Sequence, residues 1–306
     1  MLRCVLKTLA LTFLLQFATT AAHAVEAEQV YDGGFKENST ISLRIGNGGA
    51  GQSGMIAELA NVFIRECVED GAEPFRVAWY KSDTTESVDH LKTGIVDVAI
   101  TYNSVAEKVA VFRGIASKSL FIWNDHFMLV GPHSNPARLD MKSDIYSMIS
   151  TIFAMAESGA TDPPVKFLSR FDKSATNIKE SELFIAIGQV PWANPRAAWY
   201  HEYMAYPIEA LNAAARLMEY TITDRGTYLS VSEKIRNLTT IYKVGTDDPD
   251  DPLLNPAHLL VGTKAQDLAL ANKFADWLVS AAGQSVIARF KKDGKLVYTS
   301  ALRKGR

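Results

Sequence analysis

The segment at residues 45–59, IGNGGAGQSGMIAEL, is rich in glycine, which lets a backbone approach a ligand closely. Its residues 46–51 fit the pattern G-x-G-x-x-G, between a predicted strand and a predicted helix. Backbone N–H groups at a helix N-terminus attract anions, and a nearby hydroxyl adds a donor. We therefore expect a small anion to contact Asn47, Gly48, Gly49, Gly51 and Ser53.

Two other interpretations of this glycine segment stay open. A dinucleotide site needs an acidic residue about 20 residues further on, whereas Asp83 lies 32 residues past Gly51. The segment could also be a tight turn that binds nothing.

A second segment, LSRFDKSATNIKE at residues 168–180, also runs from a predicted strand through a loop into a predicted helix. Arg170 offers a rigid fork of donors suited to a tetrahedral oxyanion, and Asp172 could hold that fork in place. Ser174 and Thr176 could donate hydroxyls beside the first N–H groups of the helix. The alternative is a capped surface helix with a solvated ion pair.

Three further residues are candidates for the same site. Asn103 and Ser104 follow a predicted parallel strand, at the end where such sheets bind ligands. Arg225 could also face the ligand, or it could form an ion pair with Asp224.

Sequence patterns for catalysis and metal binding are absent. Ser53 lacks the second glycine of G-x-S-x-G, and no pair of histidines has the spacing H-x-x-x-H. We therefore expect no enzyme activity, no metal and no cofactor.

Strands and helices alternate along the chain, which predicts an α/β fold with mainly parallel sheets flanked by helices. The stretch at 124–136 is predicted to pass from one lobe to another. The pattern at 221–231 is strand-like, and 266–283 reads as one helix that stops at Gly283. We expect lobe 1 to comprise 25–125 and 258–306, and lobe 2 to comprise 126–257.

The first 24 residues have the basic start, leucine-rich run and Ala-His-Ala end of a secretory signal peptide. Its removal would leave one cysteine, Cys67, expected in the core, and a formal charge of about −4, which does not favour nucleic acid. Asn38 and Asn237 begin glycosylation sequons, and we expect glycans at both if the source is eukaryotic.

The motifs resemble a known family. The stretch Ser169-Arg170-Phe171-Asp172-Lys173-Ser174-Ala175-Thr176 is similar to Ser-Arg-Gly-Asp-x-Ser-Gly-Thr in the tungstate-binding branch of type II periplasmic solute-binding proteins, which serve ABC importers. The resemblance continues through NDHFMLVGP, YTITDRGTYL (220–229), DPLLNPAHLLV (251–261) and the last long helix. It implies a two-lobed, periplasmic-binding-protein-like fold with the ligand cleft between the lobes.

The resemblance further implies a secreted monomer that captures tungstate or molybdate without catalysis. An importer component in the membrane would be its partner if the source is bacterial. The sequons and the lack of a lipid anchor suggest a secreted eukaryotic relative, such as a fungal one, instead. The alternative function is a secreted enzyme or interaction protein that binds an organic anion or a peptide.

The chain also departs from the family. Glycines and Asn47 replace the hydroxyl residues of the first-lobe loop, and Phe171 and Ala175 replace two glycines. Alanine would be strained if position 175 needs a positive φ. A free carboxylate oxygen on Asp172 would favour hydrogen phosphate, whereas an occupied one would favour fully deprotonated anions.

Overall fold

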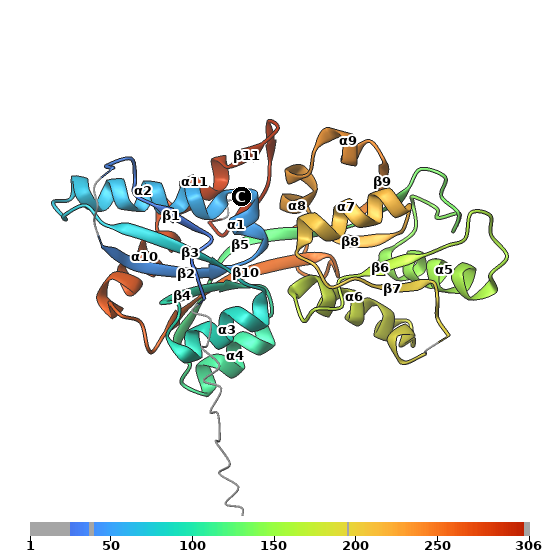
Figure 1. Ribbon diagram of the computed structural model, residues 1–306, viewed down its shortest axis with the longest axis horizontal. Coiled ribbons are helices and arrows are strands. Elements are labelled where there is room, and N and C mark those ends of the chain that lie inside the picture. The colour runs from blue at the N-terminus through green and yellow to red at the C-terminus, as the bar shows by residue number, and fades with distance from the viewer. Residues whose placement is uncertain (1–24, 37–39, 195, 303–306) are drawn as a thin grey trace, which may run out of the picture.

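The computed structural model describes residues 25–36, 40–194 and 196–302. These residues form two α/β lobes that lie side by side and are joined by long strands (Figure 1). The predicted signal peptide at 1–24 and the sequon residue Asn38 lie outside the described residues.

The first lobe is built on a twisted sheet. Its strands follow the order β1 (Gln29–Tyr31), β3 (Arg76–Lys81), β2 (Ile41–Asn47), β4 (Val98–Thr101), β10 (Leu254–Gly262), β5 (Ala116–Pro132) and β13 (Thr299–Ser300). Around it lie α1 (Gly49–Ser53), α2 (Met55–Glu69), α3 (Thr84–Thr93), α4 (Ser104–Phe112), α10 (Leu268–Val279) and α11 (Ala281–Arg289). A small hairpin joins β11 (Lys291–Lys292) to β12 (Lys295–Leu296).

Local sequence explains these helices. Helix α2 buries apolar side chains spaced along one face, including Cys67, which is confirmed as a core residue at 2% exposed. Asp83 and Glu86 form a capping box at the start of α3, and Gly94 ends that helix in the left-handed conformation at φ 79°. Residues in the local sequence therefore set both ends of α3.

The second lobe surrounds the far half of β5, which pairs with β8 (Thr221–Asp224) and β9 (Thr239–Val244). A separate parallel pair joins β6 (Phe167–Ser169) to β7 (Tyr200–Glu202). The helices of this lobe are α5 (Ile145–Ser158), α6 (Ala175–Ala186), η1 (Pro191–Ala193), α7 (Pro207–Leu217), α8 (Arg225–Ser230) and α9 (Glu233–Arg236).

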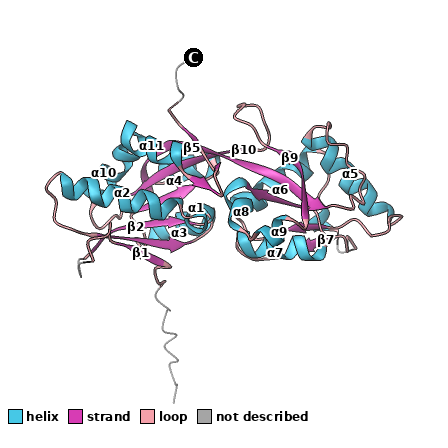
Figure 2. Cartoon of the chain, turned by 90° about the horizontal axis from the view of Figure 1, so that it is seen from above, coloured by secondary structure: helices cyan, strands magenta, loops and turns pink. Residues whose placement is uncertain are grey.

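Each lobe has a large hydrophobic core of its own, and Leu229 of α8 packs into the core of the first lobe. One core includes Phe63, Trp123 and Phe274, and the largest in the second lobe includes Phe167 and Tyr220. Strands β5 and β10 run antiparallel along the middle of the molecule and link the lobes (Figure 2).

Strand directions follow from these connections. The neighbours of β2 that are reached through helical crossovers, β3 and β4, are parallel to it, as the strand–helix alternation predicts. The long strands β5 and β10 add antiparallel pairs on either side, so the complete sheet is mixed.

Two predicted elements are wrong. The strand-like pattern at 221–231 is a short strand followed by helix α8, because the carboxylate of Asp224 accepts from the N–H of Thr227 and caps the helix. The predicted helix at 266–283 ends at Val279, and Ser280 caps the next helix. Gly283 lies inside α11, where a Cβ would come within 2.5 Å of the Trp277 carbonyl oxygen.

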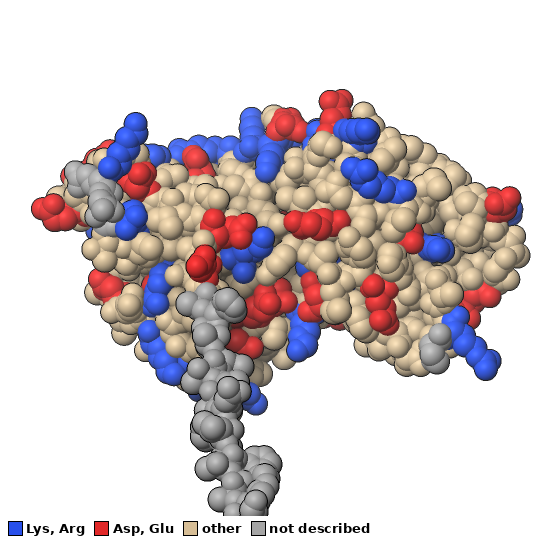
Figure 3. Space-filling view, viewed as in Figure 1, with Lys and Arg blue, Asp and Glu red and all other residues tan. Residues whose placement is uncertain are grey.

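The surface carries mixed charge. On the face shown in Figure 3, basic and acidic side chains are interspersed and no single sign covers it. Within residues 25–36, 40–194 and 196–302, no helix has the length and apolar character needed to cross a bilayer.

Candidate functional site

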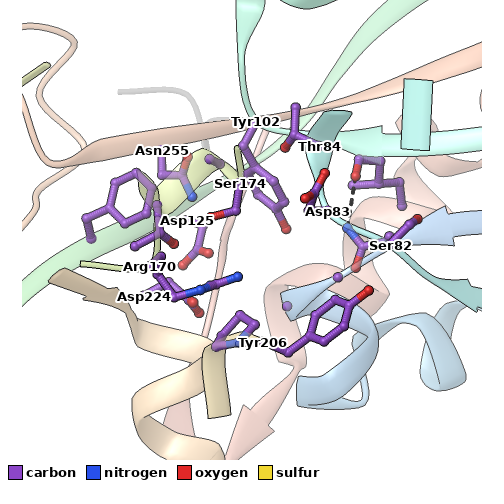
Figure 4. A pocket seen from close by; sticks show the side chains of 18 residues that line it. Ser82, Asp83, Thr84, Tyr102, Asp125, Arg170, Ser174, Tyr206, Asp224 and Asn255 are labelled. Atoms are coloured by element: carbon purple, nitrogen blue, oxygen red, sulfur yellow. Dashed lines mark hydrogen bonds between the residues drawn. The ribbon is translucent and has the colours of Figure 1, made fainter. Parts of the chain in front are cut away.

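A small cavity of about 50 Å³ lies between the lobes. Figure 4 shows Asp125, Arg170 and Asp224 together in one part of it, and Ser82, Asp83 and Tyr206 in another. Its wall is formed by Asn47, Gly48, Gly49, Ser82, Asp83, Thr84, Ile100, Tyr102, Asp125, Phe127, Arg170, Ser174, Ala175, Thr176, Tyr206, Pro207, Asp224 and Asn255. The volume is enough for roughly four water molecules, which suits a small ion.

Arg170 is the arginine of this wall, and it is 3% exposed. One terminal nitrogen donates to Asp172, while the buried Nε has no hydrogen-bond partner. A buried N–H without a partner is costly, so this group is suited to an acceptor brought by a ligand.

The loop after Arg170 brings the carboxylate of Asp172 next to the start of helix α6. The second oxygen of Asp172 accepts from the backbone N–H of Ser174 at 3.0 Å, so both oxygens of this carboxylate are occupied. The hydroxyl of Ser174 accepts from the N–H of Asn177 and caps α6. Its own hydrogen remains available to donate into the cavity, as does that of Thr176 nearby.

The backbone of this loop corrects one expectation. Ala175 is the first residue of α6 and does not have a positive φ, so it carries none of the expected strain. The left-handed residues are instead Phe171 at φ 46° and Lys173 at φ 72°.

A buried polar cluster supports the loop from behind. The hydroxyl of Ser169 donates to Glu180, Asn177 donates to the same carboxylate at 2.7 Å, and Tyr200 donates to Ser169 at 2.9 Å. Burial raises the pKa of Glu180 to about 7, although these hydrogen bonds act in the opposite direction.

The glycine segment is divided between two roles. Gly48 and Gly49 line the cavity. Asn47 also reaches the wall, but its side chain is committed, because it accepts from the N–H of Gly51 and donates to the carbonyl of Ile100 at 2.9 Å.

The last two residues predicted in this segment lie away from the cavity. A Cβ on Gly51 would lie 2.0 Å from the indole of Trp79, so this glycine makes room for a core side chain. The Ser53 hydroxyl contacts the carbonyl of Ala50 and the hydroxyl of Tyr298.

Other predicted residues lie near the cavity without lining it. Asn103 and Ser104 border an adjoining cavity of about 150 Å³ that shares Tyr102 and Asn255 with the first. Arg225 lies outside both sets, although its charge lowers the pKa of Asp125. Asn237 is exposed at the end of α9, as a sequon asparagine must be.

Sequence reasoning missed several residues of the wall. Asp125 and Phe127 alternate along β5 and share a face, Asn255 pairs with Asp125 across β10, and Asp224 pairs with Phe127 across β8. The additional residues Ser82, Asp83, Thr84 and Tyr206 come from strand ends and helix starts, and Tyr102 belongs to the strand end whose next residues, Asn103 and Ser104, were predicted. Parallel sheets bind ligands at the carboxyl ends of their strands, and this signal, used for Asn103 and Ser104, also applies to Ser82, Asp83 and Thr84 directly after β3.

Contacts across the cavity hold the lobes together. The hydroxyl of Thr85 donates to the carbonyl of Lys173 at 3.1 Å, and the hydroxyl of Tyr206 donates to Glu86 at 3.2 Å. The ammonium of Lys81 lies 4.9 Å from the centre of the Tyr206 ring. The chain is therefore in a closed arrangement.

Two α/β lobes are linked by crossing strands, and a small cavity lined by polar side chains lies between them. This arrangement defines the class of two-lobed solute-binding proteins. Residues 21–282 match the family described as the PBP superfamily domain. The chain belongs to this superfamily.

Individual relatives agree with this assignment. The chain is 30% identical over 223 residues to the tungstate-binding protein TupA of Peptoclostridium acidaminophilum, with 69% of each chain covered. It therefore also belongs to the family of that protein.

Solved structures show the same fold. One, described as "a periplasmic putative metal binding protein", is 57% identical with a TM-score of 0.82, over 89% of this chain and 98% of that one. TupA from Desulfovibrio alaskensis G20 is 23% identical with a TM-score of 0.67, over 86% and 98%. Among the described residues of the present chain, no group of three or more His, Cys, Asp or Glu side chains is placed to hold a metal ion.

Proposed function

We propose that this chain is a solute-binding protein that captures a small oxyanion, such as tungstate or molybdate, between its lobes without catalysis. The observation that carries the proposal is the buried Nε of Arg170, which has no protein partner at the wall of a cavity of about 50 Å³. Ser174 and Thr176 add hydroxyl donors from the same loop and helix start. The names of relatives that bind tungstate support the same ligand class.

The size of the cavity argues against the alternative function. A volume of about 50 Å³ is small beside the roughly 300–1,000 Å³ of pockets for larger organic ligands, so the cavity favours a small ion over a peptide. The occupied oxygens of Asp172 also remove the acceptor that would have favoured hydrogen phosphate at that residue.

Other parts of the proposal concern the whole protein. We propose lobe boundaries near 125/126 and 257/258, within the crossing strands, and a monomeric protein secreted after cleavage at Ala24. An importer component in the membrane would receive the anion in a bacterium.

A thermal-unfolding series tests the ligand. The chain from Val25 onward is heated with tungstate, molybdate, sulfate or phosphate, and one anion should raise the unfolding midpoint clearly. An anion at 100 times its Kd adds about 2.7 kcal/mol to the unfolding free energy.

Matched arginine variants show where the anion binds. Arg170→Ala should abolish the stabilisation, while Arg289→Ala, at an exposed position in α11, should retain it. A shift produced only by small organic anions, or one that survives Arg170→Ala, would favour the alternative.

A further inference from the structure

The cavity wall carries more acid than base. Its arginine, Arg170, faces a space that is also lined by the carboxylates of Asp83, Asp125 and Asp224. If all three were ionised, a fully deprotonated oxyanion would meet an excess of negative charge. The site therefore needs a way to reduce that charge when an anion enters.

Two of the three carboxylates are committed to helix starts. Asp83 accepts from the N–H of Glu86 at 2.8 Å and caps α3. Asp224 accepts from the N–H of Thr227 at 2.7 Å and from its hydroxyl at 2.5 Å, so each oxygen has a donor. Burial raises the pKa of both groups, and the hydrogen bonds of the caps act in the opposite direction.

Asp125 has a different environment. It is 3% exposed in the middle of β5, and one oxygen accepts from the N–H of His126 at 2.7 Å. Figure 4 shows its carboxylate beside Arg170. Burial raises the pKa of Asp125 well above its usual value and the charge of Asp224 adds to this.

Several other groups around Asp125 also influence its pKa. The His126 N–H, the charge of Arg225 and the amide of Asn255 lower its pKa, in that order. The phenols of Tyr102 and Tyr298 also lie near, and burial raises the pKa of both well above the usual value.

We propose that the anion binds together with one proton, which Asp125 and the anion share. With tungstate or molybdate, Asp125 takes the proton from solvent and donates its O–H to an anion oxygen. With hydrogen phosphate, the ligand brings the proton and donates it to the Asp125 carboxylate. This inference rests on the proposed function and adds a residue that selects anions by their protonation.

Proton linkage gives the expected pH dependence. Above the pKa of Asp125 in the ligand-free protein, the Kd for tungstate should rise by up to tenfold per pH unit. The affinity for hydrogen phosphate should not fall in this way once phosphate is fully in its dianionic form, because this anion carries its own proton. The ratio of the two affinities therefore moves toward phosphate as pH rises.

Isothermal titration calorimetry tests the coupling on the chain from Val25 onward, with tungstate at pH 7–10. Two buffers of different ionisation enthalpy count the protons taken up. We expect uptake approaching one proton per anion at the alkaline end and the corresponding slope in the Kd. Binding with no slope and no uptake up to pH 10 would overturn the inference and leave the proposed function standing, whereas no binding of any oxyanion would overturn both.

Three variants locate the proton. Asp125→Asn should remove the pH slope, and its unfolding midpoint checks that it folds. Glu180→Gln is the matched control, because Glu180 lies in the cluster behind the Arg170 loop and burial raises its pKa to about 7; the pH slope of this variant should persist. Loss of the slope in Asp224→Asn together with its persistence in Asp125→Asn would assign the proton to Asp224 and overturn the proposal.

Discussion

Replacing Gly51 by alanine distinguishes the structural glycine of the segment from those at the cavity. An ideal Cβ at this position would lie 2.0 and 2.1 Å from two carbons of the Trp79 ring, well inside van der Waals contact. The ring has little freedom to move, because Trp79 is 4% exposed and its Nε1 donates to the carbonyl of Asn47 at 2.7 Å.

The magnitude follows from two opposing effects. Overpacking a dense core costs about 1–3 kcal/mol, while alanine in place of glycine within a helix such as α1 stabilises by about 1 kcal/mol. Because the new Cβ would lie only 2.0 Å from the ring, the upper end of the overpacking cost applies, and we expect Gly51→Ala to lower the unfolding free energy by about 2 kcal/mol. Movement of Trp79 would also disturb the bond that holds the end of β2.

Gly49→Ala is the matched control in the same short helix. The nearest atom to its new Cβ would be Oδ2 of Asp224 at 3.7 Å, which is ordinary contact. Its stability should stay equal or rise slightly, while anion affinity changes, because Gly49 lines the cavity.

Urea unfolding of both variants, with tungstate titrations, measures these effects. A Gly51→Ala variant as stable as the unmodified chain would contradict the expected overpacking. So would a Gly49→Ala variant that loses more stability than Gly51→Ala.

Two further predictions concern the support and the closure of the site. The pKa of Glu180 is raised from 4.5 to about 7, so its contribution to stability is full below pH 4.5 and is lost as pH rises to about 7. Glu180→Gln should therefore flatten this part of the pH profile and be more stable than the unmodified chain at pH 8, by up to about 3 kcal/mol; equal pH profiles would contradict it. Thr85→Val removes the bond to the Lys173 carbonyl across the cleft, so the anion Kd should rise by roughly 2–12-fold at 0.5–1.5 kcal/mol per hydrogen bond. Calorimetry measures this Kd, and an unchanged value would show that the bond does not stabilise closure.

Local patterns in the sequence pointed to three second-lobe residues that line the cavity. Arg170, Ser174 and Thr176 lie within seven consecutive residues, so the strand end and helix start that contain them bring them to one place. Even there, the sequence raised the question of a positive φ only at Ala175, whereas positive φ values occur at Phe171 and Lys173. The path of a loop depends on what it packs against as well as on its own residues.

The glycine segment shows why the first-lobe half was harder. Gly48 and Gly51 are both glycines of the G-x-G-x-x-G pattern, yet one lines the cavity and the other accommodates Trp79. A glycine shows that space is needed but not what occupies it, and that occupant comes from another strand.

The sequence by itself determined the class of fold, the division into two lobes and the arginine-containing helix start, because these depend on periodicity, capping and short-range spacing. Only the tertiary structure decided that Asp125, Asp224 and Asn255 share a wall with Arg170. These residues belong to strands that meet where β5 and β10 cross between the lobes. Register between distant strands fixes such neighbours, and register is a property of the folded sheets rather than of any one segment.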